Sequence, residues 1–323
     1  MRKLGLYAIV LVILASIIAV VTNFQSKKSS EKPAAFYPDF SDSTCSAILM
    51  IEKSDTAKIL RKGLRWYVTG HGDYPADSAA VIKALGKLKT MTKDELLSQN
   101  PGKQAELQVD SANGLFVEAW NDKGATLGGM VIGKCGANND SYFVRPKDSN
   151  NVYLVFDNDV RFSFFANAKR WRDKYIVKFD KSDVRMLTIA RKDSGAITIK
   201  RVAGAAQDTA VKESWEIIRP VHAEAKKDKV DDLLNKMLHL VAADFEGNTA
   251  LSAEKMGFTK PELTLSVTLG SGQTRSLIVG GKKVAMNWIK NPDIGKTVFT
   301  VYEYDVTYLC DAAKFSTLKA VAP

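Results

Sequence analysis

Few side chains in this sequence have the type and spacing that catalysis requires. The nucleophile elbow G-x-S-x-G and the phosphate loop G-x-x-x-x-G-K-[ST] are both absent from it. The histidines do not recur at matching positions of two similar segments, and we interpret His239 as a packed helix residue rather than a base. We therefore predict no catalytic residue and no cofactor. The histidines are His71, His222 and His239.

Metal-binding patterns are equally sparse. Asp157 and Asp159 imitate the start of a calcium loop, but the later Gly and bidentate Glu of that loop are missing. We interpret the pair as the first turn of a helix over residues 157–168, where carboxylates complement exposed N–H groups. The odd number of cysteines allows at most one disulfide, and a thiol metal site has no partners, so free thiols and no metal are expected. The cysteines are Cys45, Cys135 and Cys310.

One polar loop offers groups that bind sugars. Asn138, Asn139 and Asp140 lie between two expected strands and carry amide and carboxylate oxygens. These three residues are the ligand-loop candidates, although polar loops of this kind usually bind nothing.

The N-terminal segment has the pattern of a membrane anchor. Residues 4–24 carry no charge and are mostly apolar, and at about 1.5 Å per residue they are long enough to cross a hydrocarbon layer of about 30 Å. A cleaved signal peptide is the competing interpretation, but its apolar region is usually shorter and ends in a small-x-small site, which is not found here. We predict an uncleaved single-pass anchor that exports the C-terminal body. The anchor residues are Leu4, Leu6, Ile9, Leu11, Ile13, Ile17 and Val20.

The net charge of the chain is +10, and the basic residues are spread along it rather than gathered in a block. This distribution indicates solubility and attraction to anionic surfaces. Outside the cytoplasm, we do not expect nucleic acid as a partner.

Two similar segments follow the N-terminal region. Trp66 and Trp215 are 149 positions apart, and so are Val81 and Val230. Such an internal repeat indicates two copies of one structural unit. We divide the chain into residues 1–24 (cytoplasmic tip and anchor), 25–44 (tether), 45–168 (first repeat), 169–183 (connector) and 184–323 (second repeat).

Each repeat has the same order of expected elements. Short alternating strands come first, a helix over residues 76–91 or 226–241 follows, and further strands complete the unit. We predict an α+β fold, in which each repeat is an antiparallel sheet with helices packed on one face. Trp66 and Trp215 are expected to fill the core.

The segment "RWRDKYIVKFDKSDV" between the repeats mixes basic and aromatic residues. Because its alternation is imperfect, we expect an extended connector with solvated basic side chains. Trp171, Tyr175 and Phe179 are the predicted seam between the repeats.

Several passages of the sequence resemble a bacterial family called domain of unknown function 4340. They are "W-x-V" before the "PAD…V…AL" helix, "VIGK" followed by "YFVRP…NNVYLV", and "WRDKYIVKFDKSDVRMLTI". The resemblance covers nearly all of the chain, although the second repeat has "NWIKNP" in place of "YxVRP". It implies a membrane-anchored extracytoplasmic protein, often found beside ABC transporters of the kind linked to gliding motility. The family supplies no catalytic residues.

We therefore expect a non-catalytic scaffold or accessory protein of an ABC-transporter complex. Its partners would be the lipid bilayer, through the N-terminal helix, and the permease subunits. It would reside in the bacterial cytoplasmic membrane with its body on the outer side. The alternative is an extracytoplasmic binder or hydrolase of cell-wall glycan.

Overall fold

The chain divides into two compact units, residues 1–64 with 79–168, and residues 65–78 with 169–323. The predicted anchor, residues 4–24, lies outside the described residues except for Ser16, and no helix within the described ranges is long and apolar enough to span a bilayer. The computed structural model describes Ser16 and residues 32–70, 73–202, 213–246, 251–295 and 297–320.

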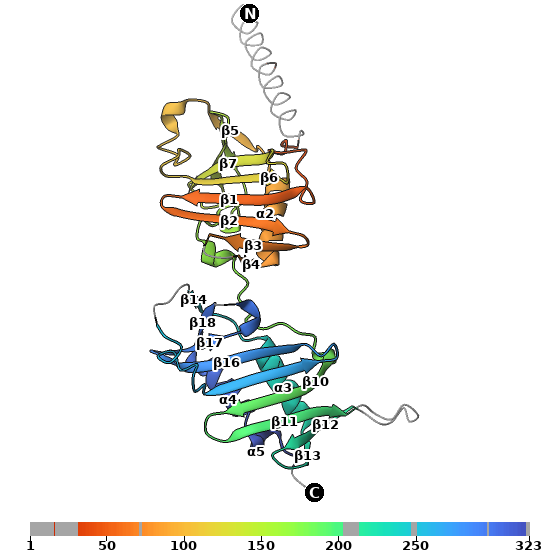
Figure 1. The fold of residues 1–323 in the computed structure, drawn as a ribbon. Helices are drawn as coiled ribbons and strands as arrows, with labels where there is room; N and C mark the ends of the chain where they lie inside the picture. Colours follow the sequence, from red (N-terminus) through yellow and green to blue (C-terminus); the bar gives the residue numbers. More distant parts are fainter. Residues whose placement is uncertain are drawn as a thin grey trace, which may run out of the picture. The chain divides into compact units, whose positions relative to one another are not determined.

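In the described part of the chain, the first sheet contains nine antiparallel strands in the order β4-β3-β2-β1-β6-β7-β8-β9-β5 (Figure 1). Ile48 of β1 pairs with Ile59 of β2 and with Ala119 of β6, and all three side chains are buried on one face. The strands are β1 (Cys45–Glu52), β2 (Asp55–Lys62), β3 (Arg65–Thr69), β4 (Tyr74–Pro75), β5 (Glu95–Ser98), β6 (Leu115–Asn121), β7 (Thr126–Cys135), β8 (Tyr142–Pro146) and β9 (Val152–Val155).

The second sheet repeats this topology, in the order β13-β12-β11-β10-β15-β16-β17-β18-β14. Leu187 of β10 pairs with Ile199 of β11 and with Val267 of β15. In the first sheet, Ile48 pairs with the neighbouring strands in the same way. The shared strand order confirms the predicted internal repeat. The strands are β10 (Val184–Arg191), β11 (Gly195–Val202), β12 (Ser214–Arg219), β13 (Ala223–Ala225), β14 (Asp244–Glu246), β15 (Leu263–Leu269), β16 (Thr274–Lys283), β17 (Met286–Lys290) and β18 (Val298–Tyr302).

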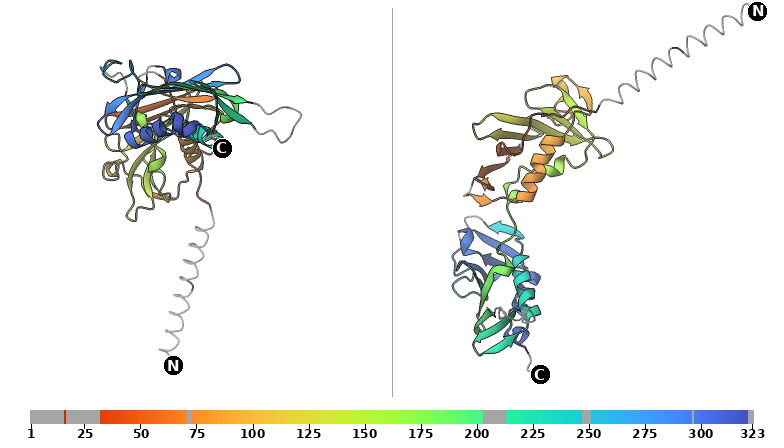
Figure 2. Two further views of the ribbon diagram at one scale, coloured as in Figure 1. Left: turned by 90° about the horizontal axis from the view of Figure 1, so that it is seen from below. Right: turned by 90° about the vertical axis from the view of Figure 1, so that its right-hand side faces the viewer.

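Helix α2 (Ser78–Thr90) accompanies the first sheet. Val81, Leu85 and Leu88 recur at i, i+4 and i+7 and are buried, which is the spacing that places side chains on one helix face. Figure 2 shows the helix lying along one face of the sheet. The face of the first sheet that is turned away from α2 is called the far face below.

Three helices of the described residues cover one face of the second sheet. Val230 and Leu234 of α3 belong to the same buried cluster as the strand residues Ile199 and Ile217. Trp215 is part of this cluster and Trp66 is also buried, so the prediction that both tryptophans fill a core is confirmed. The helices are α3 (Lys227–Leu238), α4 (Glu303–Ala312) and α5 (Phe315–Leu318).

The balance of helix and strand differs from the prediction. Four α-helices and eighteen strands are present in the described residues, so this part of the chain is mostly β, with fewer helices than the predicted α+β fold suggests. The strands that enlarge the sheets, such as β4 and β13, are only two and three residues long. The antiparallel sheets and their tandem arrangement are as predicted.

The loop between β5 and β6 folds over part of the far face of the first sheet. Leu107 and Val109 of this loop form a buried cluster with Val131 and Val152 of the sheet. A Cβ on Gly133 would lie 2.3 Å from the carbonyl oxygen of Leu107, so this close approach requires glycine. The loop therefore covers the β7–β9 half of this face.

The second sheet contains the same close approach. A Cβ on Gly280 would lie 2.3 Å from the carbonyl oxygen of Met256, and Met256 is buried with Trp288 and Val298. The close approach of a loop in each sheet thus explains why glycine occurs at equivalent positions of the two repeats, as Gly133 in "VIGK" and Gly280 in "IVGG".

The predicted helix over residues 157–168 is wrong. The described segment has a 3₁₀ helix at Arg161–Ser163, Phe164 then adopts an extended conformation, and a second 3₁₀ helix begins only at Ala168. Oδ1 of Asp157 accepts the backbone N–H of Asp159 at 2.9 Å. Such a local bond offers the backbone an alternative to the helix.

The two carboxylates form ion pairs with α2 instead of capping a helix. Asp159 lies 2.8 Å from Nζ of Lys83, and Asp157 lies 2.5 Å from Nζ of Lys87. Burial alone would raise the pKa of Asp157, but the hydrogen bonds from Lys87 and the Asp159 N–H lower it. These acids fasten the end of the first repeat to α2.

Candidate functional site

The alternation of side chains along β1 shows which residues lie on the part of the far face that the β5–β6 loop leaves open. Ala47 and Leu49 of β1 alternate with the fully buried Ile48 and Met50, and therefore project to the opposite side. Ala47 pairs with Leu60 of β2 and with Trp120 of β6. Three neighbouring strands thus place two large apolar side chains around a small one.

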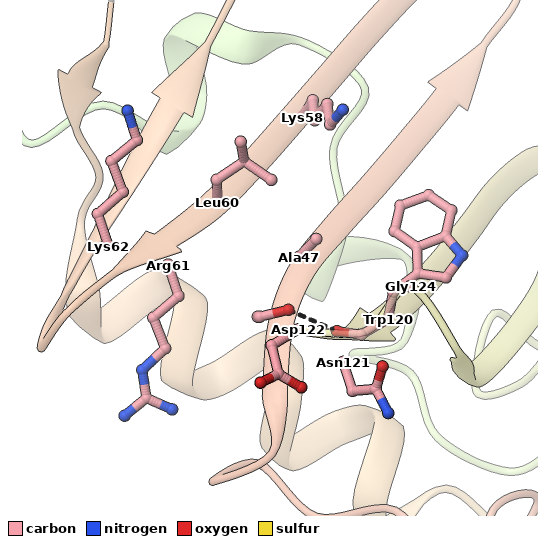
Figure 3. Close-up of a pocket in the computed structure, with 10 residues that line it drawn as sticks. Ala47, Lys58, Leu60, Arg61, Lys62, Trp120, Asn121, Asp122 and Gly124 are labelled. Carbon is pink, nitrogen blue, oxygen red and sulfur yellow. Dashed lines mark hydrogen bonds between the residues drawn. The ribbon is translucent and has the colours of Figure 1, made fainter.

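Ala47, Leu60 and Trp120 line an open groove of about 560 Å³. Figure 3 shows Leu60 and Ala47 between Lys62 and the indole ring of Trp120, with Arg61 pointing away from them. We call this hollow the β2–β6 groove. It is lined by Ser46, Ala47, Lys58, Leu60, Arg61, Lys62, Trp120, Asn121, Asp122 and Gly124.

The groove combines an apolar floor with a largely cationic rim. Lys58 and Lys62 are exposed at alternate positions of β2, so both project on the same side as Leu60. Arg61 projects on the other side, and its guanidinium donates to the carbonyl oxygen of Ser43 at 3.0 Å. Asp122 is the single carboxylate among the described residues that line the groove.

The turn between β6 and β7 holds one end of the groove. Oδ1 of Asn121 accepts the backbone N–H groups of Lys123 and Ala125 at 3.0 and 2.9 Å. Gly124 has a φ of +78°, which favours glycine at this position. The hydroxyl of Ser46 donates to the carbonyl oxygen of Trp120 at 3.3 Å (Figure 3). The backbone that carries Trp120 is therefore fixed before any ligand binds.

An ion pair between a buried carboxylate and an exposed lysine lies on the same face, two residues along β6 from Trp120. Glu118 is buried, and its Oε1 accepts hydrogen bonds from Nζ of Lys147 at 2.5 Å and from Oγ1 of Thr126 at 3.0 Å. The hydrogen bond with Glu118 raises the pKa of Lys147. The pair holds β6, β7 and the segment after β8 together beside the groove.

The second sheet has polar residues at the positions equivalent to Leu60 and Trp120. Met186 stands where the first sheet has Ala47, and its partners are Lys200 and Thr268 in place of Leu60 and Trp120. The position of Glu118 is taken by Ser266, which shares a hydrogen bond of 2.9 Å with Ser276. The apolar groove is thus particular to the first copy of an otherwise shared fold.

The predicted ligand-loop candidates lie elsewhere. Asn138, Asn139 and Asp140 form the exposed turn between β7 and β8 and do not line the β2–β6 groove. Oδ1 of Asn139 accepts a hydrogen bond from Sγ of Cys135, and Oδ1 of Asp140 accepts one from the hydroxyl of Ser141, each at 3.0 Å. Their polar groups serve the turn, and a ligand for them remains a prediction.

The predicted seam residues differ in their environment. Trp171 is 1% exposed, whereas Tyr175 is 46% exposed. Phe179 is partly buried against the core of the second unit. The role of the three as a seam between the repeats stays a prediction.

The connector is held by its backbone and by Arg172. The N–H of Asp77 donates to the carbonyl oxygen of Trp171 at 2.7 Å. The Arg172 guanidinium lies 5.3 Å from the ring centre of Tyr74 and 5.4 Å from that of Phe245, which is within cation–π range. At least one basic side chain of the connector is therefore packed rather than solvated.

The remaining chemical candidates are not brought together. Within the described ranges, no three His, Cys, Asp or Glu side chains form a metal-ligand group. His239 is exposed beyond the end of α3, so the prediction that it is packed is wrong; its Nδ1 lies 2.8 Å from the carbonyl oxygen of Asn235. His222 is exposed, and His71 lies outside the described residues. All three cysteines are free.

Sequence reasoning missed the groove. Lys58, Leu60 and Trp120 lie in ordinary strand patterns, and no motif distinguishes them. A comparison of the two repeats at outward-facing strand positions would have found it, because Leu60 and Trp120 are apolar where Lys200 and Thr268 are polar.

A family model described as Domain of unknown function (DUF4340) matches residues 66–214. The match includes β3, α2, the strands β6–β9, the connector and the start of the second sheet. No curated protein and no solved structure matches the chain.

Proposed function

We propose that the chain, whose residues 66–214 match the model of the domain of unknown function 4340 family, is a non-catalytic, membrane-anchored accessory protein of an ABC-transporter complex. In this proposal the β2–β6 groove binds an acidic, partly apolar segment of a permease subunit. The protein resides in the bacterial cytoplasmic membrane, with its two sheets on the outer side.

The β2–β6 groove is the observation that carries this proposal. Leu60 and Trp120 offer apolar surface beside the ammonium groups of Lys58 and Lys62. Aromatic side chains with apolar neighbours are the usual anchors of protein interfaces, and a cationic rim selects acidic partners. The equivalent face of the second sheet presents Lys200, Thr198 and Thr268 instead, which supports the first unit as the binding unit in this proposal.

The membrane location rests on the sequence. The uncharged and mostly apolar residues 4–24 have the length of a membrane-spanning helix, and residues 25–33 link them to the first backbone contact of the fold, at Ala34. A permease subunit is the partner that such an anchor would bring within reach of the groove.

A cell-wall glycan is the second candidate ligand. Trp120 offers an indole face, and Asn121 and Asp122 of the adjacent turn offer polar groups. Sugars bind by combining an apolar ring face with hydrogen bonds, so this set of residues favours a glycan more than Asn138, Asn139 and Asp140 do.

Co-purification of the full-length chain with ABC-transporter permease subunits of the same bacterium tests the proposal. Under mild detergent extraction we expect the subunits to be retained by the unchanged chain and lost with Trp120→Ala. The matched control is Thr268→Ala, at the equivalent position of the second sheet, which should retain them. A chain that emerges alone and instead binds purified wall glycan through Trp120 would replace this proposal with the glycan alternative.

A further inference from the structure

The strand β5 at the edge of the first sheet is unusually apolar for an edge. Leu96 and Leu97 are 48% and 44% exposed, and Phe156, just after β9, is 57% exposed. The N–H of Phe156 donates to Oδ2 of Asp94 at 2.7 Å, which keeps Phe156 beside the start of β5. In the described part of the sheet, β5 is the last strand and pairs with β9. We call Leu96, Leu97 and Phe156 the β5 patch.

The equivalent edge of the second sheet is protected. β14 occupies the same place in the strand order, but its sequence is Asp-Phe-Glu. Asp244 is paired with Lys169, Glu246 is paired with Lys283, and Phe245 between them is buried. Charged residues of this kind are the usual protection of an edge strand. The exposed leucines of β5 are therefore not a requirement of the shared fold.

The β5 patch lies close to the point where the N-terminal segment joins the first unit. The N–H of Lys93 donates to the carbonyl oxygen of Ala34 at 2.8 Å, and the N–H of Phe36 donates to that of Met91 at 3.0 Å. Leu96 and Leu97 follow Lys93 by three and four residues, which is roughly 10–14 Å along an extended strand. The patch and the attachment point thus share one edge of the sheet.

The chain between the predicted anchor and this attachment is short. Residues 25–33 are nine residues, and an extended chain spans at most about 3.6 Å per residue, or roughly 30 Å in total. A first unit tied so closely to a membrane helix can bring the β5 patch to the bilayer surface.

We propose that the β5 patch rests on the lipid bilayer and seats the first unit at the membrane surface. This inference rests on the membrane anchoring in the proposed function. Leucine and phenylalanine side chains insert into the boundary between headgroups and acyl chains. The contact is shallow, because the backbone of an edge strand and the carboxylate of Glu95, which is exposed, must remain among water and headgroups.

Photo-crosslinking to lipid tests this inference on the full-length chain. Leu97→p-benzoylphenylalanine is reconstituted into vesicles of phosphatidylethanolamine and phosphatidylglycerol, irradiated, and analysed for lipid adducts by mass spectrometry. The matched control is Leu64→p-benzoylphenylalanine, since Leu64 is 93% exposed in the turn between β2 and β3. Leu96→p-benzoylphenylalanine is the second variant, in case substitution at Leu97 disturbs folding.

We expect several-fold more lipid adduct from positions 96 and 97 than from position 64. Equal yields at the three positions, or adducts from β5 to a second copy of the chain, would overturn the inference. Carbonate extraction separates the two proposals. A chain that stays in the vesicles without adducts at β5 contradicts only the bilayer contact, whereas a chain released by carbonate contradicts the anchored function and the contact together.

Discussion

Nζ of Lys147 lies 2.5 Å from Oε1 of Glu118, and the Glu118 side chain is only 6% exposed. The two residues belong to different parts of the first repeat, because Glu118 lies on β6 and Lys147 follows β8. Their pairing fixes the strand that carries Trp120. The β2–β6 groove therefore depends on a contact outside its own lining.

Removal of the Lys147 ammonium should destabilise the first unit. Lys147→Met leaves the carboxylate of Glu118 buried without its charged partner, which is more costly than the loss of an exposed ion pair. We expect a lower Tm for Lys147→Met in thermal denaturation, and a Tm close to that of the unchanged chain for Lys147→Arg. An unchanged Tm for Lys147→Met would show that the pair does not support β6.

Truncation of Trp171 should be strongly destabilising. Its side chain is 1% exposed, and replacing a buried tryptophan by alanine typically costs about 3–5 kcal/mol. Trp171→Ala should lower the free energy of unfolding in urea by this amount and increase proteolysis near Lys169. Tyr175→Ala is the control, because Tyr175 is half exposed; similar losses for both variants would argue against a buried role for Trp171.

Alkaline pH should weaken the fold partly through Cys45. Burial raises the pKa of the Cys45 thiol from 9.0 to about 11. The folded state thus holds this proton more tightly than the unfolded state, and the associated stability is present below pH 9 and lost as the pH rises through about 11.

Titration of stability against pH checks this expectation. The free energy of unfolding should fall less steeply for Cys45→Ala than for the unchanged chain between pH 9 and 11. Tyr37 has its pKa raised to about 12 by burial and titrates in an overlapping range, so the comparison is between the two slopes. Parallel slopes would mean that the Cys45 thiol does not contribute.

Two glycines of the first unit should respond to alanine in opposite ways. Gly133→Ala places a methyl group against the Leu107 carbonyl oxygen, and such overpacking typically costs about 1–3 kcal/mol. A Cβ on Gly86, within α2, has no neighbour within 4 Å, so Gly86→Ala should stabilise the chain by up to about 1 kcal/mol. Chemical denaturation measures both, and a neutral Gly133→Ala would contradict the close loop approach.

Periodicity predicted the long elements of this fold well. Val81, Leu85 and Leu88 are spaced at helical intervals and are buried on α2, because side-chain spacing reports directly on the covered face. The short strands β4 and β13 carry too few residues for any alternation to be recognised.

The wrong helix prediction over residues 157–168 has a local cause, whereas the groove was not predicted for a non-local reason. Val160 and Phe164 have helical spacing and are both buried, yet the hydrogen bond between Asp157 and the Asp159 N–H favours a turn. The groove depends on strand register, which brings Ala47, Leu60 and Trp120 together from distant parts of the sequence. The pattern of one repeat does not show which face α2 covers, so these residues stand out as a surface only when the two repeats are compared.

The most direct test of the central claim is photo-crosslinking from inside the β2–β6 groove. Leu60→p-benzoylphenylalanine in the full-length chain, produced together with ABC-transporter permease subunits of the same bacterium, should yield a covalent adduct with one of them. Lys200→p-benzoylphenylalanine, at the equivalent position of the second sheet, should yield none. Equal adducts from both positions, or no permease adduct from position 60, would contradict the assignment of the groove as the binding site for the transporter.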